Sequence, residues 1–332
     1  MLPLVSVTIC FLDNHLKYFK KLMNSLENQT VKTIEIIIVD KTKSTVVSEF
    51  NPIRGSFLNF YIIKDSVPSG FAYNYNNAIK KSRGNFVFVL NPDTFLAPNC
   101  IEEILTIFEK DDKIGCVSPK ILRMNENLLS YNPPIIDSTG LYLTPFIRHF
   151  DRGADEIDFG QYNEISYIFG VTGAAQFFKK SCLEDIKILD QYFDEDFWSY
   201  REDADISWRL WNYGWKCAYT STAIMYHART AKPNSRKKIN QLINMHSVKN
   251  RYLLLINNIS IKNFLIYLPF ILYRDLLIIV KVFLFERTSI EAFLYIKKNL
   301  RYLLKKRKII HSKITKDMSS YWFLHKSIKL KC

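Results

Sequence analysis

The sequence has few cysteines, and none is spaced for a zinc site or a disulfide framework. They stand at positions 10, 100, 116, 182, 217 and 332, and no CxxC motif is present. Scattered cysteines of this kind are typical of buried, reduced thiols. The chain also starts Met1-Leu2-Pro3 without a basic segment or cleavage site, so no secretory signal is expected. These absences favour a reducing, cytoplasmic compartment.

Acidic residues are scarce in the last third of the chain. Residues 228–332 carry 23 Lys and Arg against 4 Asp and Glu, a net charge of +19, whereas residues 1–227 carry 23 against 28, a net charge of −5. The composition is 48% hydrophobic, which supports a sizeable core. We therefore predict an acidic body, with halves of about 1–122 and 123–227, and a basic region over 228–332 that has different partners.

A clean apolar run of membrane-spanning length is also missing. Residues 264–285 come nearest, but Arg274, Asp275 and Lys281 interrupt them. A charge at the bilayer centre costs about 2.5–3.5 kcal/mol, so amphipathic helices in the interface fit better. Basic residues over 297–308 add about 1 kcal/mol each near an anionic leaflet. We expect peripheral attachment to the inner face of the cell membrane; a solvated helix packed on the core stays open as the alternative.

Short apolar runs alternate with segments of helical spacing along the body. Strands are predicted at 4–11, 34–40, 58–63, 86–90, 115–121, 165–169, 174–178 and 216–220. Helices are predicted after residue 16 and at 71–82, 98–110 and 200–213. The stretch 123–164 is less regular and is interpreted as an excursion on the acceptor side. This alternation predicts an α/β fold, a Rossmann-like and mostly parallel sheet flanked by helices, followed by a helical C-terminal region.

The segment Asn91-Pro92-Asp93 directly follows the apolar run 86–90. A residue before proline is pushed away from helix, so Asn91 extends the strand end. Asp93 then lies at the carboxyl edge of the sheet, where open α/β folds bind ligands. A single acid there suits a divalent cation that bridges to phosphate oxygens. The alternative is an Asp that starts a turn or caps a helix.

Further candidates stand at the ends of other elements. Glu202-Asp203 opens a helix, where a carboxylate is favoured by the dipole and can act as a general base, although acids in first turns are common. Asp40 ends a strand and could accept the N3–H of a pyrimidine, or be a turn residue. Gly70-Phe71 starts a helix whose N–H groups suit diphosphate. His227 follows the last strand and could be a ligand or a core residue.

In their order and spacing, these pieces resemble glycosyltransferase family 2 of the GT-A type, most closely its rhamnosyltransferase-like members. The similarity covers about residues 4–255. The segments that carry it are VSVTICFLDN, IEIIIVDK, SGFAYNYNNAIKKSRGNFVFVLNPDTFLAPNCIEEI, GVTGAAQFFKK, FDEDFWSYREDADISWRLWNYGWKCAYTSTAIMYH and KNRYLLLINN.

The resemblance implies a role for each matching residue. Asp40 would contact the base, Asp93 would bind the metal in a DxD-like motif that begins at Asn91, and His227 would contact the metal or the diphosphate. The implied nucleotide-sugar site comprises Cys10, Phe11, Asp40, Gly70, Phe71, Asn91 and Asp93. The pair Glu202-Asp203 would supply the base, with Asp203 the expected one. Trp198 and Tyr200 lie where acceptor sugars would stack.

Some positions depart from the family pattern. Pro68 stands where an Asn is frequent, Tyr73-Asn74 replaces a Gly-Gly pair, and Lys41 replaces an Asn. These changes leave the reaction type in place but leave the donor open.

The resemblance implies an inverting transferase that uses Mn²⁺ or Mg²⁺ to move a sugar, rhamnose in the most similar members, from a dTDP- or UDP-linked donor. The acceptor would be a glycan or lipid-linked glycan of surface-polysaccharide biosynthesis, such as O-antigen or capsule. Transfer of another hexose or of galactofuranose is an alternative. So is a non-catalytic nucleotide-sugar-binding membrane scaffold. No recognised nucleic-acid-binding motif accompanies the basic region, so nucleic acid is not an expected partner.

Overall fold

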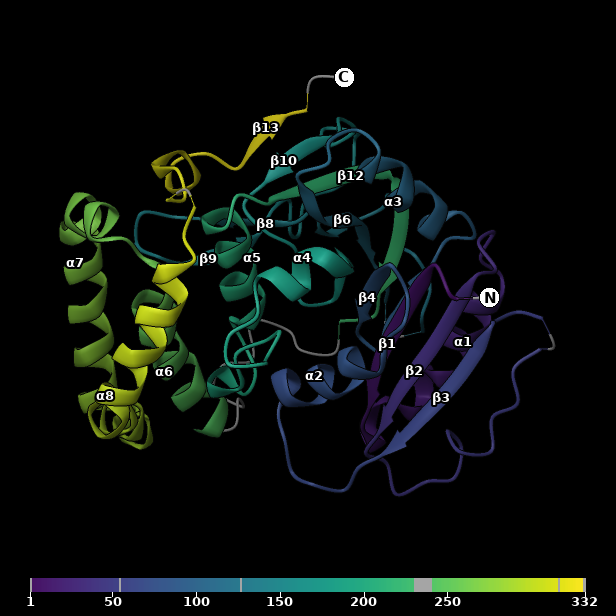
Figure 1. The fold of residues 1–332 in the computed structure, drawn as a ribbon, viewed down its shortest axis with the longest axis horizontal. Helices are drawn as coiled ribbons and strands as arrows, with labels where there is room; N and C mark the ends of the chain where they lie inside the picture. The colour runs from purple at the N-terminus through teal and green to yellow at the C-terminus, as the bar shows by residue number, and fades with distance from the viewer. Residues whose placement is uncertain (1, 54, 126, 230–240, 316, 331–332) are drawn as a thin grey trace.

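The computed structural model describes residues 2–53, 55–125, 127–229, 241–315 and 317–330. A twisted sheet with helices on both faces forms the body (Figure 1). Its strands are β1 (Val5–Phe11), β2 (Ile34–Asp40), β3 (Asn59–Lys64), β4 (Phe86–Leu90), β5 (Thr94–Leu96), β6 (Ile114–Arg123), β7 (Ile136–Ser138), β10 (Ser166–Ile168), β11 (Ala175–Lys179), β12 (Lys216–His227) and β13 (Ser327–Lys329); β8 (Leu141–Leu143) and β9 (His149–Asp151) form a separate pair.

The helices cover the sheet from two sides. They are α1 (Phe19–Glu27), α2 (Phe71–Lys81), α3 (Cys100–Phe108), α4 (Lys180–Asp185), α5 (Glu202–Asn212), α6 (Gln241–Asn258), α7 (Ile261–Phe285) and α8 (Ile290–Ser312). One apolar core forms between the sheet and α1 and α3, and a second between the sheet and α2, α4 and α5. Strands such as β2 are buried along their whole length, which explains their unbroken apolar runs.

The strand order is β13-β10-β12-β6-β11-β4-β1-β2-β3. The pairs within β4-β1-β2-β3 are parallel, as is β6 with β12, whereas β11, β10 and β13 pair antiparallel with their neighbours. The predicted helix-flanked α/β fold is confirmed. The sheet is parallel over β4-β1-β2-β3 and mixed beyond it, because β11 runs antiparallel to both β4 and β6 and β10 runs antiparallel to β12.

The parallel strands bring their carboxyl ends to one edge. Phe11 at the end of β1 lies beside Asp40 at the end of β2, and Leu90 at the end of β4 pairs with Ile9. Asn91 therefore follows β4 at the edge where β1 and β2 end. This edge is where the predicted donor residues were expected.

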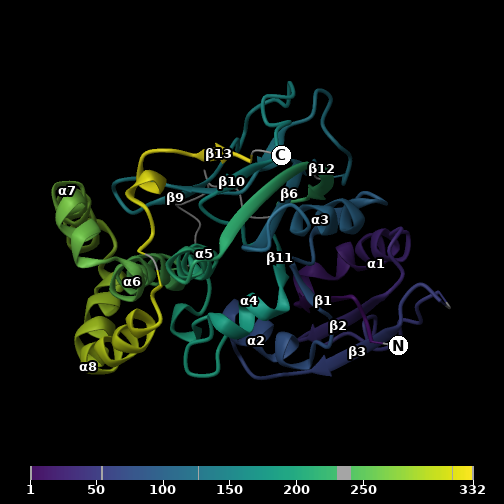
Figure 2. The ribbon, with the colours of Figure 1, turned by 45° about the horizontal axis from the view of Figure 1, so that its top comes forward.

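The C-terminal region is helical, as predicted. Helices α6, α7 and α8 pack together at one side of the molecule, opposite β3 (Figures 1 and 2). They form a third apolar core with α5, and β13 returns to pair with β10. The division of the chain at residue 227 stays a prediction. None of the helices among the described residues combines the length and apolarity needed to cross a bilayer.

Candidate active site

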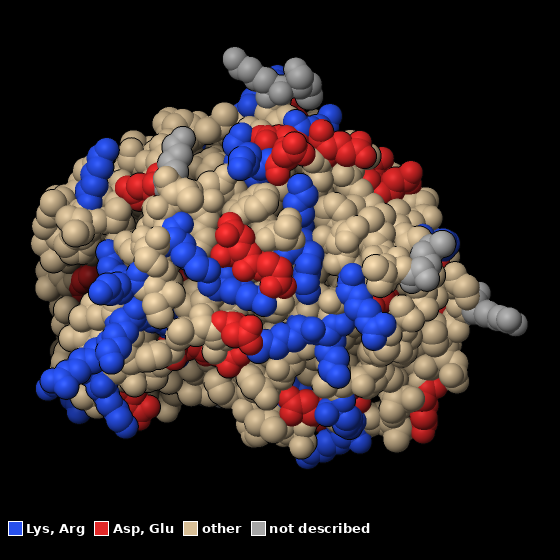
Figure 3. Space-filling view, viewed as in Figure 1, with Lys and Arg blue, Asp and Glu red and all other residues tan. Residues whose placement is uncertain are grey.

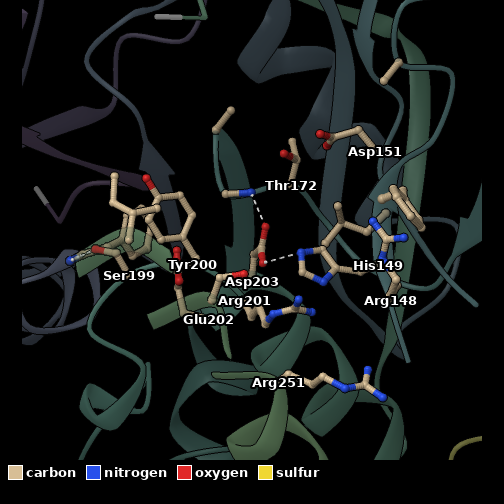
Figure 4. Close-up of a pocket in the computed structure, with 18 of the residues that line it drawn as sticks. Arg148, His149, Asp151, Thr172, Ser199, Tyr200, Arg201, Glu202, Asp203 and Arg251 are labelled. Carbon is tan, nitrogen blue, oxygen red and sulfur yellow. Dashed lines mark hydrogen bonds and ion pairs between the residues drawn. The ribbon is translucent and has the colours of Figure 1, made fainter. Parts of the chain in front are cut away.

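A cavity of about 970 Å³ opens between the strand edge, the start of α5 and the C-terminal helices. It brings together side chains that are far apart in the chain. The predicted residues that line it are Phe71, Asn91, Asp93, Tyr200, Glu202, Asp203 and His227. Both acids on which the sequence analysis depends, Asp93 and Asp203, thus line the same open cavity. Figure 4 shows Asp203 in this cavity, with Glu202 and His149 beside it.

Asp93 and His227 meet at the strand edge. Thr94 of β5 pairs with His227 at the end of β12, which places Nε2 of His227 3.3 Å from Oδ1 of Asp93. Nδ1 of His227 lies 2.7 Å from Oδ2 of Asp137. Burial would lower the pKa of His227, but the hydrogen bonds and charges of Asp137 and Asp93 outweigh it and raise that pKa to about 10. The imidazole is therefore held in a fixed orientation between two carboxylates.

Asp137 anchors this group from behind. Its Oδ1 accepts hydrogen bonds from Nε of Arg123 at 3.0 Å and from Nη1 of Arg229 at 2.8 Å. Burial opposes ionisation of Asp137, yet the hydrogen bond and charge of His227 and the charge of Arg229 hold its pKa well below the usual range. Sequence reasoning missed Asp137. It lies in the irregular stretch 123–164, and no local pattern links it to His227 or Arg229, about ninety residues further along the chain.

The start of α5 holds the two acids of the predicted base pair. Glu202 is buried, and its Oε2 has no hydrogen-bond partner among the described residues. Burial, followed by the charge of Asp203, raises the pKa of Glu202 well above its ordinary value. Burial also raises the pKa of Asp203, but the N–H groups of Ala204 and Gly173 and the charge of Arg201 oppose that rise. Burial and the charge of Asp203 thus favour the neutral form of Glu202, whereas the two N–H groups and Arg201 favour the carboxylate form of Asp203.

Asp203 is fixed by its neighbours. Its Oδ2 accepts the N–H of Gly173 at 3.0 Å, and its Oδ1 accepts the N–H of Ala204 at 2.7 Å. Nε2 of His149, on β9, lies 3.8 Å from Oδ1. Burial and the charges of Arg201 and Arg148 lower the pKa of His149 to about 3, so this imidazole is neutral. Sequence reasoning missed His149, which lies in the irregular stretch before β10.

The structure places other predicted donor residues outside this cavity. Cys10 and Phe11 are buried at the end of β1, and burial raises the pKa of the Cys10 thiol to about 12. Asp40 is buried as well; its Oδ1 accepts the N–H of Thr42 at 2.9 Å, and its Oδ2 lies 2.8 Å from Nζ of Lys64. A base contact by Asp40 stays a prediction, and it would have to share the carboxylate with Lys64.

The start of α2 is occupied by the segment that precedes α5. The N–H of Phe71 donates to Oγ of Ser199 at 3.0 Å, and the N–H of Ala72 donates to the carbonyl of Trp198 at 3.1 Å. The predicted diphosphate site at Gly70 and Phe71 therefore requires this segment to move. Its role stays a prediction.

The loop before α5 has an unusual backbone conformation. Its residues Trp198, Tyr200 and Arg201 have positive φ angles of 65°, 72° and 70°. The side-chain amide nitrogen of Asn250, on α6, lies 2.8 Å from the carbonyl oxygens of Phe197 and Ser199 and 2.7 Å from that of Tyr200. A left-handed conformation is costly for such residues, so Asn250 offsets part of the strain. The C-terminal region thus holds the loop that leads to Asp203.

The two predicted acceptor aromatics lie apart. Tyr200 is 47% exposed and lines the main cavity. Trp198 stacks on the ring of His246 with centroids 5.9 Å apart, in a neighbouring pocket of about 340 Å³. Acceptor stacking by both side chains stays a prediction, and Tyr200 has the better position for it.

The donor set at the strand edge fits a divalent cation. Asp93 offers a carboxylate oxygen in the cavity wall, and His227 offers Nε2 once a cation displaces the proton held between this nitrogen and Asp93. Within the described ranges, no group of three or more His, Cys, Asp or Glu side chains is arranged to hold a metal. Mg²⁺ and similar ions commonly take one or two protein ligands and complete their shell with water and substrate phosphates. Two ligands therefore suit a cation that is shared with a nucleotide diphosphate.

A helix-flanked, partly parallel sheet with an acid at its carboxyl edge and a second acid pair across one cavity defines a GT-A type glycosyltransferase domain. The family model described as "Glycosyl transferase family 2" matches residues 6–173, just over half of the chain. The chain belongs to glycosyl transferase family 2. The predicted family is therefore confirmed.

Individual relatives agree with this assignment. Chondroitin synthase of Escherichia coli is 30% identical over 155 residues, which cover 45% of this chain and 22% of the synthase. Staphylococcus aureus TarS 1–349, solved with UDP-GlcNAc, has a TM-score of 0.57 at 16% identity and covers 92% of this chain and 89% of that one. The mannosyltransferase PcManGT of Pyrobaculum calidifontis, solved with GDP-Man and Mn²⁺, has a TM-score of 0.51 at 13% identity, covering 94% and 86%.

The first curated relatives are matched over only 13%, 35% and 22% of their own length. The two solved structures have under 25% sequence identity to this chain, so their likeness shows a common fold.

Proposed function

We propose that this protein is an inverting, divalent-metal-dependent glycosyltransferase that moves a sugar from a nucleotide-diphosphate donor to a hydroxyl group of a surface-polysaccharide intermediate. One observation carries the proposal: the Asp93–His227 pair and the Glu202–Asp203 pair line the same cavity of about 970 Å³. A space of this size is large enough for a sugar between them. Solved proteins of the same fold were crystallised with UDP-GlcNAc or with GDP-Man and Mn²⁺, which supports a nucleotide-sugar donor and a metal.

Asp203 acts as the base in this mechanism. The N–H groups of Gly173 and Ala204 hold its carboxylate, and the raised pKa of Glu202 makes Asp203 the member of the pair that accepts the proton. The acceptor oxygen forms a bond to the anomeric carbon as the bond to the diphosphate oxygen breaks, and its proton passes to Asp203. A single displacement inverts the anomeric centre. Asp93 and His227 would hold the cation, which when bound neutralises charge on the departing diphosphate.

We also propose the identity of the transferred sugar and of the nucleotide in the donor. The resemblance to rhamnosyltransferase-like members favours a dTDP- or UDP-linked donor and rhamnose, and a hexose or galactofuranose is the second candidate. Lys41 contacts Asp65 at 3.0 Å and Ser69 at 2.9 Å, so it ties the end of β2 to the loop before α2. This contact distinguishes the donor side from the family pattern.

We also propose that the C-terminal helices attach the protein peripherally to a membrane. Apolar side chains of α7 such as Leu276, Phe283 and Phe285 are exposed, and basic side chains gather over α8 (Figure 3). The exposed basic positions of α8 are Lys297, Lys298, Arg301, Lys305 and Lys308. The polybasic run at 305–308 is divided, because Lys306 is buried against Asp194 and Asp196 and Arg307 donates to the carbonyls of Ile256 and Ile259.

A donor panel tests the proposed function. Melting temperature is measured for the full chain with Mn²⁺ and each of a set of dTDP-, UDP- and GDP-sugars, because a bound donor stabilises the fold by mass action. One donor class is expected to stabilise the protein, and NMR of the reaction products is expected to show an inverted anomeric centre. Retention of the anomeric configuration would contradict the mechanism. Donor binding without hydrolysis or transfer would favour a non-catalytic scaffold.

A further inference from the structure

Part of the cavity wall is strongly basic. Arg148, Arg201, Arg251 and Arg274 all line it, and we call them the arginine cluster. They come from the turn before β9, the loop before α5, and helices α6 and α7. Figure 4 shows the side chains of Arg148, Arg201 and Arg251 on the same side of Asp203. Four separate parts of the chain thus each contribute a guanidinium group to the wall of the same cavity.

The charges of the arginine cluster act on one another. Burial, followed by the charges of Arg251, Arg148 and Arg274, lowers the pKa of Arg201 to about 10, against an opposing effect of Asp203. Asp275 lies 2.7 Å from Nε of Arg251, and the charge of Asp203 acts on Arg201. The four guanidinium groups nevertheless repel one another, since the other three lower the pKa of Arg201. An anion bound among them would relieve this repulsion.

Arg251 shows where a hydrogen-bond acceptor is missing. The residue is 1% exposed. Its Nε contacts Asp275, and its Nη1 donates to the carbonyls of Phe146 at 2.7 Å and Ile147 at 3.1 Å. Its Nη2 is buried and has no partner among the described residues. A buried charged group with an unmade hydrogen bond is destabilising, and guanidinium groups bind phosphate oxygens through two parallel hydrogen bonds.

Helix α7 connects the arginine cluster to an apolar surface. Arg274, Ile278 and Val282 of this helix line the cavity. Its other faces carry exposed apolar side chains, which include Leu265, Leu272, Leu276, Val280, Phe283 and Leu284, each 44% to 65% exposed. Exposed apolar patches of this extent mark binding surfaces. The same helix therefore offers a cation to the cavity and a hydrocarbon-like surface next to it.

We propose that the acceptor is an amphiphile whose phosphate group binds the arginine cluster while its hydrocarbon tail lies along the exposed apolar side of α7. This inference rests on the proposed glycosyl transfer and names its acceptor class. Arg201 directly precedes Glu202 and Asp203, so the phosphate lies close to the base. The accepting hydroxyl group therefore belongs to a sugar near the phosphate, rather than to the far end of a long glycan.

Binding of defined probes to the full-length protein tests this inference. The probes are dodecyl phosphate below its micelle concentration, inorganic phosphate, dodecanoate and dodecyl maltoside, each measured by isothermal titration calorimetry. Dodecyl phosphate is expected to bind most tightly. The double variant Arg148→Gln/Arg274→Gln is expected to weaken its binding about tenfold or more, because charge-assisted hydrogen bonds are lost. Arg301→Gln, the same substitution at an exposed site of α8, serves as the matched control and is expected to bind like the wild type.

The other probes separate the sources of the signal. Inorganic phosphate binding as tightly as dodecyl phosphate would show a site for free phosphate and overturn the lipid part. Dodecanoate binding as tightly would overturn the choice of phosphate. Equal binding by the double variant and the wild type would overturn the inference altogether. If the double variant does not fold, Arg274→Lys replaces it; this variant keeps the charge but loses the fork, and unchanged binding would again overturn the inference.

Failure of this inference differs from failure of the proposed function. Stabilisation by a nucleotide sugar without any binding of dodecyl phosphate would reject the acceptor class and leave the transferase proposal intact. Binding of dodecyl phosphate without stabilisation by any nucleotide sugar would reject the transferase proposal instead.

Discussion

Gly70 and Trp198 approach so closely that a Cβ on Gly70 would lie 2.2 Å from the carbonyl oxygen of Trp198. The first turn of α2 and the loop before α5 are therefore in direct backbone contact. The N–H of Ala72 reinforces this contact by donating to the same carbonyl. The base-bearing loop is thus supported from the donor side of the molecule as well as from α6.

Gly70→Ala is expected to push the Trp198–Ser199 segment away from α2. Overpacking of this kind costs about 1–3 kcal/mol of unfolding free energy, measured by urea denaturation. Turnover is expected to fall as well, because the displaced segment leads directly to Asp203. Unchanged stability and turnover would show that the Trp198–Ser199 segment can move away from the first turn of α2 at no cost in unfolding free energy.

Asp203→Asn and Glu202→Gln form a matched pair. Asp203→Asn removes the base and is expected to lower turnover about a hundredfold or more with unchanged nucleotide affinity. Glu202→Gln replaces an acid whose pKa is raised by burial with a neutral group of the same shape, so its effect is expected to be much smaller. Steady-state kinetics and nucleotide titration check both. A larger loss in Glu202→Gln than in Asp203→Asn would reverse the assigned roles.

Removal of the metal with EDTA is expected to stop transfer, and Mn²⁺ or Mg²⁺ is expected to restore it. Asp137→Asn leaves Asp93 and His227 in place but loosens the hydrogen bond to Nδ1 of His227 at 2.7 Å. Loss of such a supporting contact typically weakens metal affinity about 10–100-fold, which a metal titration of activity would detect. Full activity in chelator would exclude a metal role.

The pH dependence of turnover reports on Asp203. Burial raises the pKa of Asp203, and the base works only when deprotonated, so turnover is expected to rise with pH through a value above that of an ordinary aspartate, about 3.9. Arg201→Gln removes a charge that favours the carboxylate. The pKa of Asp203 is then expected to rise further, and the acid limb of the profile to move to higher pH. An unchanged acid limb in the Arg201→Gln variant would show that the charge of Arg201 does not affect the pKa of the base.

Lys306 contributes to stability in a way that its neighbour does not. Its ammonium group is 1% exposed and pairs with Asp194 and Asp196. Lys306→Met leaves these carboxylates buried without their partner, at a cost of about 3–5 kcal/mol in unfolding free energy. Lys305→Met, one residue earlier on the exposed side, is expected to change it by less than about 0.5 kcal/mol. Equal effects in urea denaturation would refute the buried ion pair.

Local patterns predicted the elements whose residues are buried on two faces. The strand expected at 86–90 has those bounds in β4, because a short apolar run has few other ways to be buried. The same reasoning placed Asp93 at the carboxyl edge of the sheet, whereas the expectation that His227 acts beside it came from the family resemblance. Helix α5 begins at Glu202 rather than at residue 200, because the preceding loop is left-handed without a glycine to signal it.

Long-range contacts determined what the sequence could not predict. Asp137 reaches His227 because β7 pairs with β6, and no local periodicity records that pairing. His149 and Arg148 were also missed, because they lie in the irregular stretch, where no local periodicity indicates what they contact. Lys306 was predicted to belong to a polybasic cluster near an anionic membrane surface, since a run of four charged residues gives no sign of which one faces inward. Its partners, Asp194 and Asp196, lie more than a hundred residues earlier in the chain.

The side-chain amide of Asn250 limits how far this enzyme can be truncated without loss of activity. The family match ends at residue 173, whereas the side chain that fixes the loop before Asp203 comes from residue 250. A fragment cut after β12 would lose β13 but keep the other strands of the sheet and Asp93, His227, Glu202 and Asp203. The loop before Asp203, the proposed base, would however lack its hydrogen bonds from Asn250. The smallest working unit of this protein therefore includes α6, and shorter versions are expected to bind donor without transferring it.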